Sequence, residues 1–321
     1  MVEELEKLIR FDPKGTRCVF PNPVPKVVAA DGDKVVVIGG DNFDYLHRLG
    51  DSKNVTPITC DGSQIEMRGE NIKLDRPARS VAIEDGVVYL LDDCRWRGDY
   101  SQRVHRDVFE PQGDVILTKI YPNGETSEAV VGKAGTFMRW ACNDSSEPDC
   151  ALTARNKIAY ASFGNIIVAV GEDGCLVDSF EMENPVLSLA HDGKSLYVMM
   201  NSGIKIIKPS NEADELSLET IFQDALRKRG IEFSAERFLE GIASDGVHLY
   251  VHVRLEGYLM KYYEGIAVFK DQNLITESPI YEKHRDSRSF AVSNHAVYWK
   301  LQRTYALARL GKEHFRLLPE E

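Results

Sequence analysis

Several chemical signatures are missing from this 321-residue sequence. No apolar run approaches the roughly 18 residues that a membrane-spanning helix needs. The chain has no Gly-x-Ser-x-Gly nucleophile motif and no glycine-rich phosphate loop, which excludes the common hydrolase and nucleotide-binding signatures. None of its six cysteines forms a Cys-x-x-Cys pair, so the usual zinc and redox patterns are absent as well. We therefore predict no metal and no cofactor.

Positive charge is in short supply, because the net charge is -11. An acidic protein repels nucleic-acid phosphates, so we expect no nucleic-acid partner. The first residues are charged and lack the apolar core of a signal peptide. Residues 1–15 instead predict a short N-terminal helix, with its apolar residues on one face. These features predict a soluble, cytoplasmic protein that does not bind membranes, and they leave its oligomeric state open.

Cys142 and Cys150 lie close together in the sequence and bracket a polar loop. Two interpretations stay open for this pair. A reducing cytoplasm favours free thiols, whereas a disulfide would close the loop, as is known in some thermophile proteins.

The sequence does contain a repeated strand–turn–strand pattern. Each copy has a short apolar strand, a tight turn and a second strand that ends in a Leu-Tyr-Val-like run. Asp-Gly between alternating strands is the strongest short signal for a β-hairpin, because both turn positions require a positive φ. The turns are Asp31-Gly32, Asp85-Gly86, Asp192-Gly193, Asp245-Gly246 and the degenerate Asn294-His295.

The spacing of these turns is close to regular. Successive aspartates are 54 residues apart at the first interval and 53 at the interval from Asp192 to Asp245. The 107 residues between Asp85 and Asp192 correspond to two periods with one copy missing. We expect the missing copy to have its first strand at 137–141 and its second at 157–161, joined by the long 142–156 connection. A fixed period near 50 residues is typical of solenoids, propellers and arrays.

The content of one period selects among these architectures. Residues 157–180 hold three short strands on tight hairpins, which makes four antiparallel strands with the first strand. We therefore predict an all-β fold, a single six-bladed β-propeller of four-stranded antiparallel blades. A strand at 16–20 would complete the short last blade, which also holds a strand near 315–317, and so close the ring. Seven blades is the alternative. The six blades are predicted at about 24–78, 79–131, 132–184, 185–236, 237–285 and 286–321.

The repeat resembles the blades of the NHL and SMP-30/gluconolactonase-like superfamily of propellers. The resemblance rests on the stretch from Glu240-Gly241-Ile242-Ala243 through Asp245-Gly246 to Leu249-Tyr250-Val251 and its copies. It implies that loops between the second and third strands, and between blades, share one face at the mouth of a central tunnel. It also implies that the Asp-Gly turns lie on the opposite face, where we place the 142–150 loop too.

Candidate site residues gather on the tunnel-mouth face. A long loop after residue 92 combines arginines with aromatic residues, a pairing that suits anionic or planar ligands. Further tyrosines are predicted near the tip of a hairpin, and charged residues begin the inner strands. The predicted ligand-binding residues are Arg79, Arg95, Trp96, Arg97, Tyr100, Arg103, Glu240, Tyr258, Tyr262 and Arg288.

These features predict a non-catalytic platform that binds a protein partner or a small anionic ligand. The alternative is a propeller hydrolase or lactonase that uses Glu240, which the resemblance implies would depend on a metal. Such enzymes need several carboxylates on one cation, since Ca²⁺ takes six to eight oxygen ligands. Glu240 is the one carboxylate at the predicted rim, where Arg79, Arg288 and Lys26 carry the opposite charge.

Overall fold

The computed structural model describes part of the chain, and within that part the structure is almost entirely β-strand. The helical element there is a single 3-10 turn, η4 (Lys312–His314). No helix in the described residues is long and apolar enough to cross a membrane. The described residues are 17–19, 24–40, 42–43, 59–60, 64–67, 70–74, 78–92, 114–133, 150–200, 203–208, 213–216, 233–257, 261–270, 273–280, 289–300 and 307–317.

Most strands belong to antiparallel sheets in which neighbours along the chain pair with each other. Sheet 1 contains β2 (Val24–Asp31), β3 (Lys34–Gly40), β6 (Gln64–Met67) and β7 (Glu70–Lys73). Sheet 2 contains β8 (Ala78–Glu84), β9 (Val87–Asp92), β10 (Asp114–Ile120) and β11 (Thr126–Lys133). Sheet 3 contains β12 (Leu152–Arg155), β13 (Ile158–Phe163), β14 (Ile166–Val170) and β15 (Leu176–Glu181).

The second half of the chain continues the same pattern. Sheet 4 contains β16 (Val186–His191), β17 (Leu196–Met200), β18 (Gly203–Ile207) and β19 (Ala213–Leu216). Sheet 5 contains β20 (Phe233–Ser244), β21 (Leu249–Gly257), β22 (Lys261–Lys270), β23 (Asn273–Ile280) and β27 (Arg316–Leu317). Sheet 6 contains β24 (Phe290–Val292), β25 (Ala296–Lys300), β26 (Leu307–Gly311) and β1 (Arg17–Val19). A separate pair is formed by β4 (Asn42–Phe43) and β5 (Thr59–Cys60).

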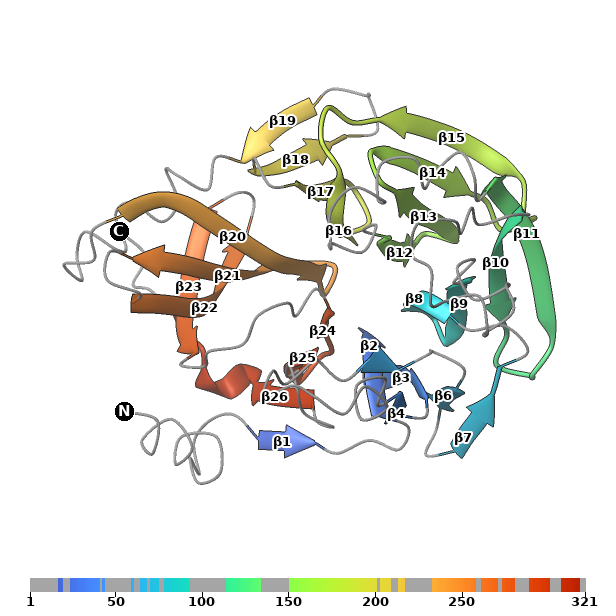
Figure 1. The fold of residues 1–321 in the computed structure, drawn as a ribbon, viewed down its shortest axis with the longest axis horizontal. Coiled ribbons are helices and arrows are strands. Elements are labelled where there is room, and N and C mark those ends of the chain that lie inside the picture. Colours follow the sequence, from blue (N-terminus) through green and yellow to red (C-terminus); the bar gives the residue numbers. More distant parts are fainter. Residues whose placement is uncertain are drawn as a thin grey trace, which may run out of the picture.

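The first strand of each sheet lies innermost. These strands contact one another in the order β2, β8, β12, β16, β20 and β24, and β24 also contacts β2. Figure 1 shows the sheets fanned around a common centre, with β7, β11, β15 and β19 on the outside. Repeated four-stranded antiparallel sheets in this arrangement define a β-propeller fold.

Both ends of the described chain add a strand to an outer edge. β1 pairs antiparallel with β26, with Arg17 opposite Arg309 and Val19 opposite Leu307. The strand predicted at 16–20 is therefore present and joins sheet 6. The strand expected near 315–317 belongs elsewhere, because β27 pairs with β23 of sheet 5.

The prediction for the third sheet was wrong about its first strand. β12 covers Leu152–Arg155, and a two-residue turn at Asn156-Lys157 connects it directly to β13. Both turn residues have positive φ, 54° and 63°, as a tight hairpin turn requires. The segment before Cys150 therefore connects two sheets and does not join two strands of one hairpin. Residues 134–149, with Cys142, lie outside the described residues.

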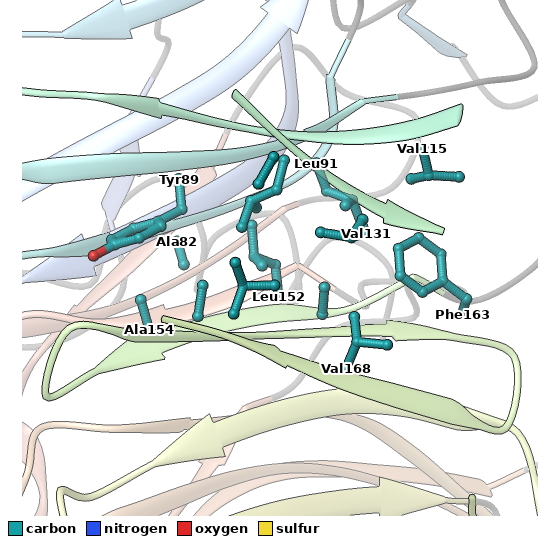
Figure 2. Packing of buried hydrophobic residues seen from close by; sticks show 14 residues of the cluster. Ala82, Tyr89, Leu91, Val115, Val131, Leu152, Ala154, Phe163 and Val168 are labelled. Carbon is teal, nitrogen blue, oxygen red and sulfur yellow. The ribbon is translucent and has the colours of Figure 1, made fainter. Parts of the chain in front are cut away.

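The hydrophobic core lies between neighbouring sheets. Leu91 and Leu117 of sheet 2 are fully buried and pack in one cluster with Leu152 and Phe163 of sheet 3 (Figure 2). Other clusters join sheets 1 and 2, sheets 3 and 4, sheets 5 and 6, and sheets 6 and 1. Burying one such side chain contributes roughly 1.5–3 kcal/mol, so each sheet is held mainly by its two neighbours.

Candidate functional site

The inner strands share an irregularity where they begin. In four of them the pairing with the second strand skips one residue, which is the mark of a β-bulge. We call these four positions and the face they mark the rim. The skipped residues are Lys26, Arg79, Leu187 and Glu240. Because bulges re-aim side chains and recur beside binding sites, the rim is the candidate site on structural grounds.

The structure places three of the predicted ligand-binding residues. Arg79 is half-buried on β8, at the bulge. Glu240 holds the equivalent position on β20, and Tyr262 lies on β22 opposite Glu256, near the end of the β21–β22 hairpin. The rim therefore unites Arg79 with Glu240, while Tyr262 belongs to a hairpin of the same sheet as Glu240. The others, Arg95, Trp96, Arg97, Tyr100, Arg103, Tyr258 and Arg288, lie outside the described residues.

Buried serines next to the rim fix the inner strands to one another. Ser289 Oγ accepts a hydrogen bond of 2.7 Å from the Val28 N–H across sheets 6 and 1. Ser188 Oγ bonds both the N–H and the carbonyl oxygen of Ile242, at 3.2 and 3.3 Å, across sheets 4 and 5. These bonds satisfy backbone groups that a buried strand would otherwise leave unpaired. They hold the rim rigidly, which favours a preformed binding surface.

The opposite face consists of the turns that follow the inner strands, and we call it the turn face. Each turn there bonds to a turn of a neighbouring sheet. Asp31 Oδ2 accepts from the Asp85 N–H at 2.8 Å, and Glu84 Oε2 accepts from the Lys157 N–H at 3.0 Å. Burial raises the pKa of Glu84, and the backbone hydrogen bond from Lys157 offsets part of that rise.

The same linkage continues around the turn face. Asn156 Nδ2 donates to the Gly193 carbonyl at 2.8 Å, from sheet 3 to sheet 4. The Asn294 N–H donates to the Gly32 carbonyl at 2.7 Å, from sheet 6 back to sheet 1. These aspartate, asparagine and glycine residues therefore have a structural role in linking turns.

Arg155 reaches across the turn face. It ends β12 in sheet 3, and its Nη1 lies 3.4 Å from Asp31 Oδ1 in sheet 1. Its guanidinium also lies against the backbone of sheet 5, because a Cβ added to Gly246 would stand 2.6 Å from Nη2. One side chain thus contacts three alternate sheets and covers their meeting point on this face.

The turns of sheets 4, 5 and 6 share one geometry that differs from that of sheets 1 to 3. Asp245 Oδ1 accepts from the N–H groups of Val247 and His248, and its Oδ2 accepts from Tyr250 Oη. Asp192 makes the corresponding bonds in sheet 4, and Ser293 Oγ accepts from two backbone N–H groups in sheet 6. The Asp-Gly pairs therefore serve as turn caps, as the sequence predicted.

Asp245 differs from Asp192 in having a cationic partner. Lys312 Nζ, from η4 beside sheet 6, lies 2.7 Å from Asp245 Oδ2 and 4.9 Å from the centre of the Tyr250 ring. Burial alone would raise the pKa of Asp245, but the hydrogen bonds from Lys312 and the turn amides lower the pKa to about 2. This charged pair attaches the end of the described chain to sheet 5.

A Gly246→Ala substitution is expected to destabilise the protein by about 1 kcal/mol more than Gly124→Ala. Both glycines have nearly the same positive φ, 88° and 89°, so backbone strain contributes equally. Only the Cβ at position 246 would displace Arg155, since nothing lies within 4 Å of the position 124 Cβ. Urea unfolding of both variants measures the difference. Equal losses would contradict the position of Arg155 across the turn face.

Sequence reasoning missed Arg155 and Lys312. Arg155 is 124 residues from Asp31, and Lys312 is 67 residues from Asp245, so no local pattern joins either pair. The one signal was Asn156, whose tolerance of positive φ marks a turn and so places Arg155 at the end of a strand. Within the described residues, no group of three or more His, Cys, Asp and Glu side chains is placed to hold a metal ion.

Comparison with known proteins identifies no family for this chain. No protein-family model matches it, and no curated protein matches it. Among solved structures, the WD40 domain of Neurospora crassa Pan2 is 10% identical, with 98% of each chain covered and a TM-score of 0.46. The extracellular domain of the putative hybrid two-component system BT4673 from B. thetaiotaomicron is 10% identical with a TM-score of 0.43. The match covers 92% of this chain and only 39% of that one.

A third similar structure is the glutaminyl cyclase of Myxococcus xanthus. It is 13% identical, with 79% of this chain and 97% of that chain covered and a TM-score of 0.35. The resemblance to NHL and gluconolactonase-like propellers remains a prediction from the repeat.

Proposed function

We propose that this protein is a non-catalytic binding platform, a six-bladed propeller whose rim holds an anionic group. That group belongs to a small molecule or to an acidic segment of a protein partner. The carrying observation is the set of equivalent bulges, which brings Lys26, Arg79 and Glu240 to the same position on three inner strands. Six blades, closed by the pairing of β1 with β26, are part of the proposal.

The chemistry of the rim supports an anionic ligand. Two of its three charged positions are basic although the whole chain carries a net charge of -11. An arginine offers a planar fork of donors that matches a carboxylate or a phosphate, and a half-buried arginine holds an anion better than a solvated one. Glu240 would then orient the ligand or repel anions that bind in the wrong position.

The turn face is less suited to this role. Its carboxylates already accept backbone N–H groups from neighbouring turns, and the Arg155 guanidinium already faces Asp31. A ligand would have to break bonds that join the sheets before it could bind there. This difference in commitment favours the rim.

Arg79→Ala is expected to weaken the binding of anionic probes about tenfold, which corresponds to the loss of one charge-assisted contact. The probes are citrate, inorganic phosphate and an eight-residue glutamate peptide, measured by isothermal titration calorimetry. Lys194→Ala is the matched control, because it removes one positive charge from an exposed residue on the turn face.

The two variants separate site binding from general attraction. Equal weakening by Arg79→Ala and Lys194→Ala would show that only net charge matters, and would overturn the rim site. Preference for the peptide over citrate and phosphate would indicate a protein partner. The reverse preference would indicate a small ligand.

A further inference from the structure

The outermost strand of sheet 3, β15, has an open edge within the described residues, since it pairs only with β14. Two other outer edges are covered by the chain itself. β1 covers β26, and β27 covers β23, both by antiparallel pairing. An edge strand of this kind is a template for another extended segment, and proteins use it to bind peptides.

The open edge of β15 carries free backbone groups. The Met182 N–H donates to the Asn165 carbonyl, so every second residue before Met182 points its N–H toward β14. The residues between them, Val177, Ser179 and Glu181, therefore direct their backbone groups outward. The Ser179 N–H accordingly donates to the side chain of Asp178, at 2.8 Å, and not to β14.

The side chains of β15 are apolar and unusually exposed. Leu176 and Val177 are 60% and 61% exposed, although both are large hydrophobic residues. Val130 on β11 is similarly exposed at 59%. It alternates with Ala129 and Val131, which pack toward sheet 3, so Val130 faces away from that sheet. Leu176 and Val177 thus form an apolar strip that belongs to β15 itself.

The surroundings of this strip are acidic. Between Lys157 and Lys194 the chain has no lysine and no arginine. Over the same stretch it carries six carboxylates: Glu172, Asp173, Asp178, Glu181, Glu183 and Asp192. A second copy of the same edge would bring Asp178 and Glu181 against like charges, which opposes self-pairing. Charge complementarity selects a basic partner instead.

We infer that β15 binds an extended peptide segment of a partner protein, one that alternates apolar residues with lysine or arginine. The segment adds a fifth strand to sheet 3, as β27 does to sheet 5. A basic side chain of the partner attracts the Asp178 carboxylate, which frees the Ser179 N–H for a backbone carbonyl of the incoming strand. Asp178 therefore blocks neutral strands and admits basic ones. This surface is separate from the rim, and its test does not depend on ligand binding there.

The test uses a fluorescein-labelled eight-residue peptide of alternating valine and lysine, with anisotropy as the readout. We expect micromolar binding, and at least tenfold weaker binding of a valine–glutamate peptide. Val177→Lys is expected to weaken binding of the valine–lysine peptide about tenfold. Val130→Lys is the matched control and is expected to leave it unchanged, since it makes the same substitution at a valine of nearly equal exposure.

A second variant tests the backbone pairing. Ser179→Pro removes one outward N–H, and a proline is tolerated on an edge strand when its nitrogen faces solvent. It is expected to abolish peptide binding while the melting temperature stays within a few degrees of the wild type. Equal effects of Val177→Lys and Val130→Lys, or equal binding of both peptides, would overturn the inference. So would a dimer in sedimentation that Val177→Lys dissociates, because the edge would then bind a second copy.

Discussion

Removal of residues 1–20 is expected to lower the melting temperature by about 5–10 °C. The deletion takes away β1, which covers the outer edge of β26. Leu307, Ala308 and Leu310 of β26 are almost completely buried, so the deletion leaves an apolar strand at an open edge. Differential scanning calorimetry measures the loss, and light scattering should show more aggregation.

A shorter deletion provides the control for this experiment. Removal of residues 1–15 keeps β1 and tests whether the segment before it matters. A large loss from both deletions would assign the effect to the preceding segment. An unchanged melting temperature after removal of residues 1–20 would refute the proposed closure of the ring by β1.

Asp245→Ala is expected to cost 3–5 kcal/mol of unfolding free energy at neutral pH, because it leaves the charge of Lys312 without its partner. Asp192→Ala is the matched control. It removes the same two turn hydrogen bonds and the same tyrosine contact, and Asp192 has no lysine within an ion-pair distance. The difference between the two variants, measured by urea unfolding, isolates the ion pair with Lys312. Equal losses would assign the stabilisation to the turn alone.

The pH dependence of stability gives a second view of Asp245. Its pKa is lowered to about 2 in the folded protein, from an ordinary value of 3.8. The stabilisation is therefore fully present above about pH 4 and is lost as the pH falls through 2. It amounts to on the order of 2 kcal/mol. Asp245→Asn should remove this part of the acid dependence, so a wild-type slope between pH 4 and 2 in that variant would contradict the ion pair.

Local sequence patterns predicted most of the strands and several turns. Asp85-Gly86 lies in a two-residue hairpin turn with both φ values positive, and Asp192 and Asp245 cap four-residue turns. The alignment of the repeats also placed Lys26, Arg79 and Glu240 at the starts of inner strands, where the structure has bulges. These features depend on neighbouring residues, so a single sequence contains enough information to predict them.

The third repeat shows where this reasoning failed. Even spacing predicted a turn near residue 138, whereas the turn occurs at Asn156-Lys157. The two intervals are 71 and 36 residues, because the connection before β12 is long and sheet 3 itself is compact. A propeller constrains the geometry of each sheet and leaves the length of its connections free, so an average period cannot locate an individual strand.

The sequence by itself determined the strand–turn–strand repeat, the four-stranded sheets and the acidic character of the chain. The tertiary structure alone decided which distant residues meet. Arg155 faces Asp31 and Gly246, Lys312 neutralises Asp245, and β27 joins sheet 5 in preference to sheet 6. Turns and strands follow from local backbone preferences, whereas contacts between sheets depend on how the sheets are placed around the centre. That placement is a property of the whole packed molecule.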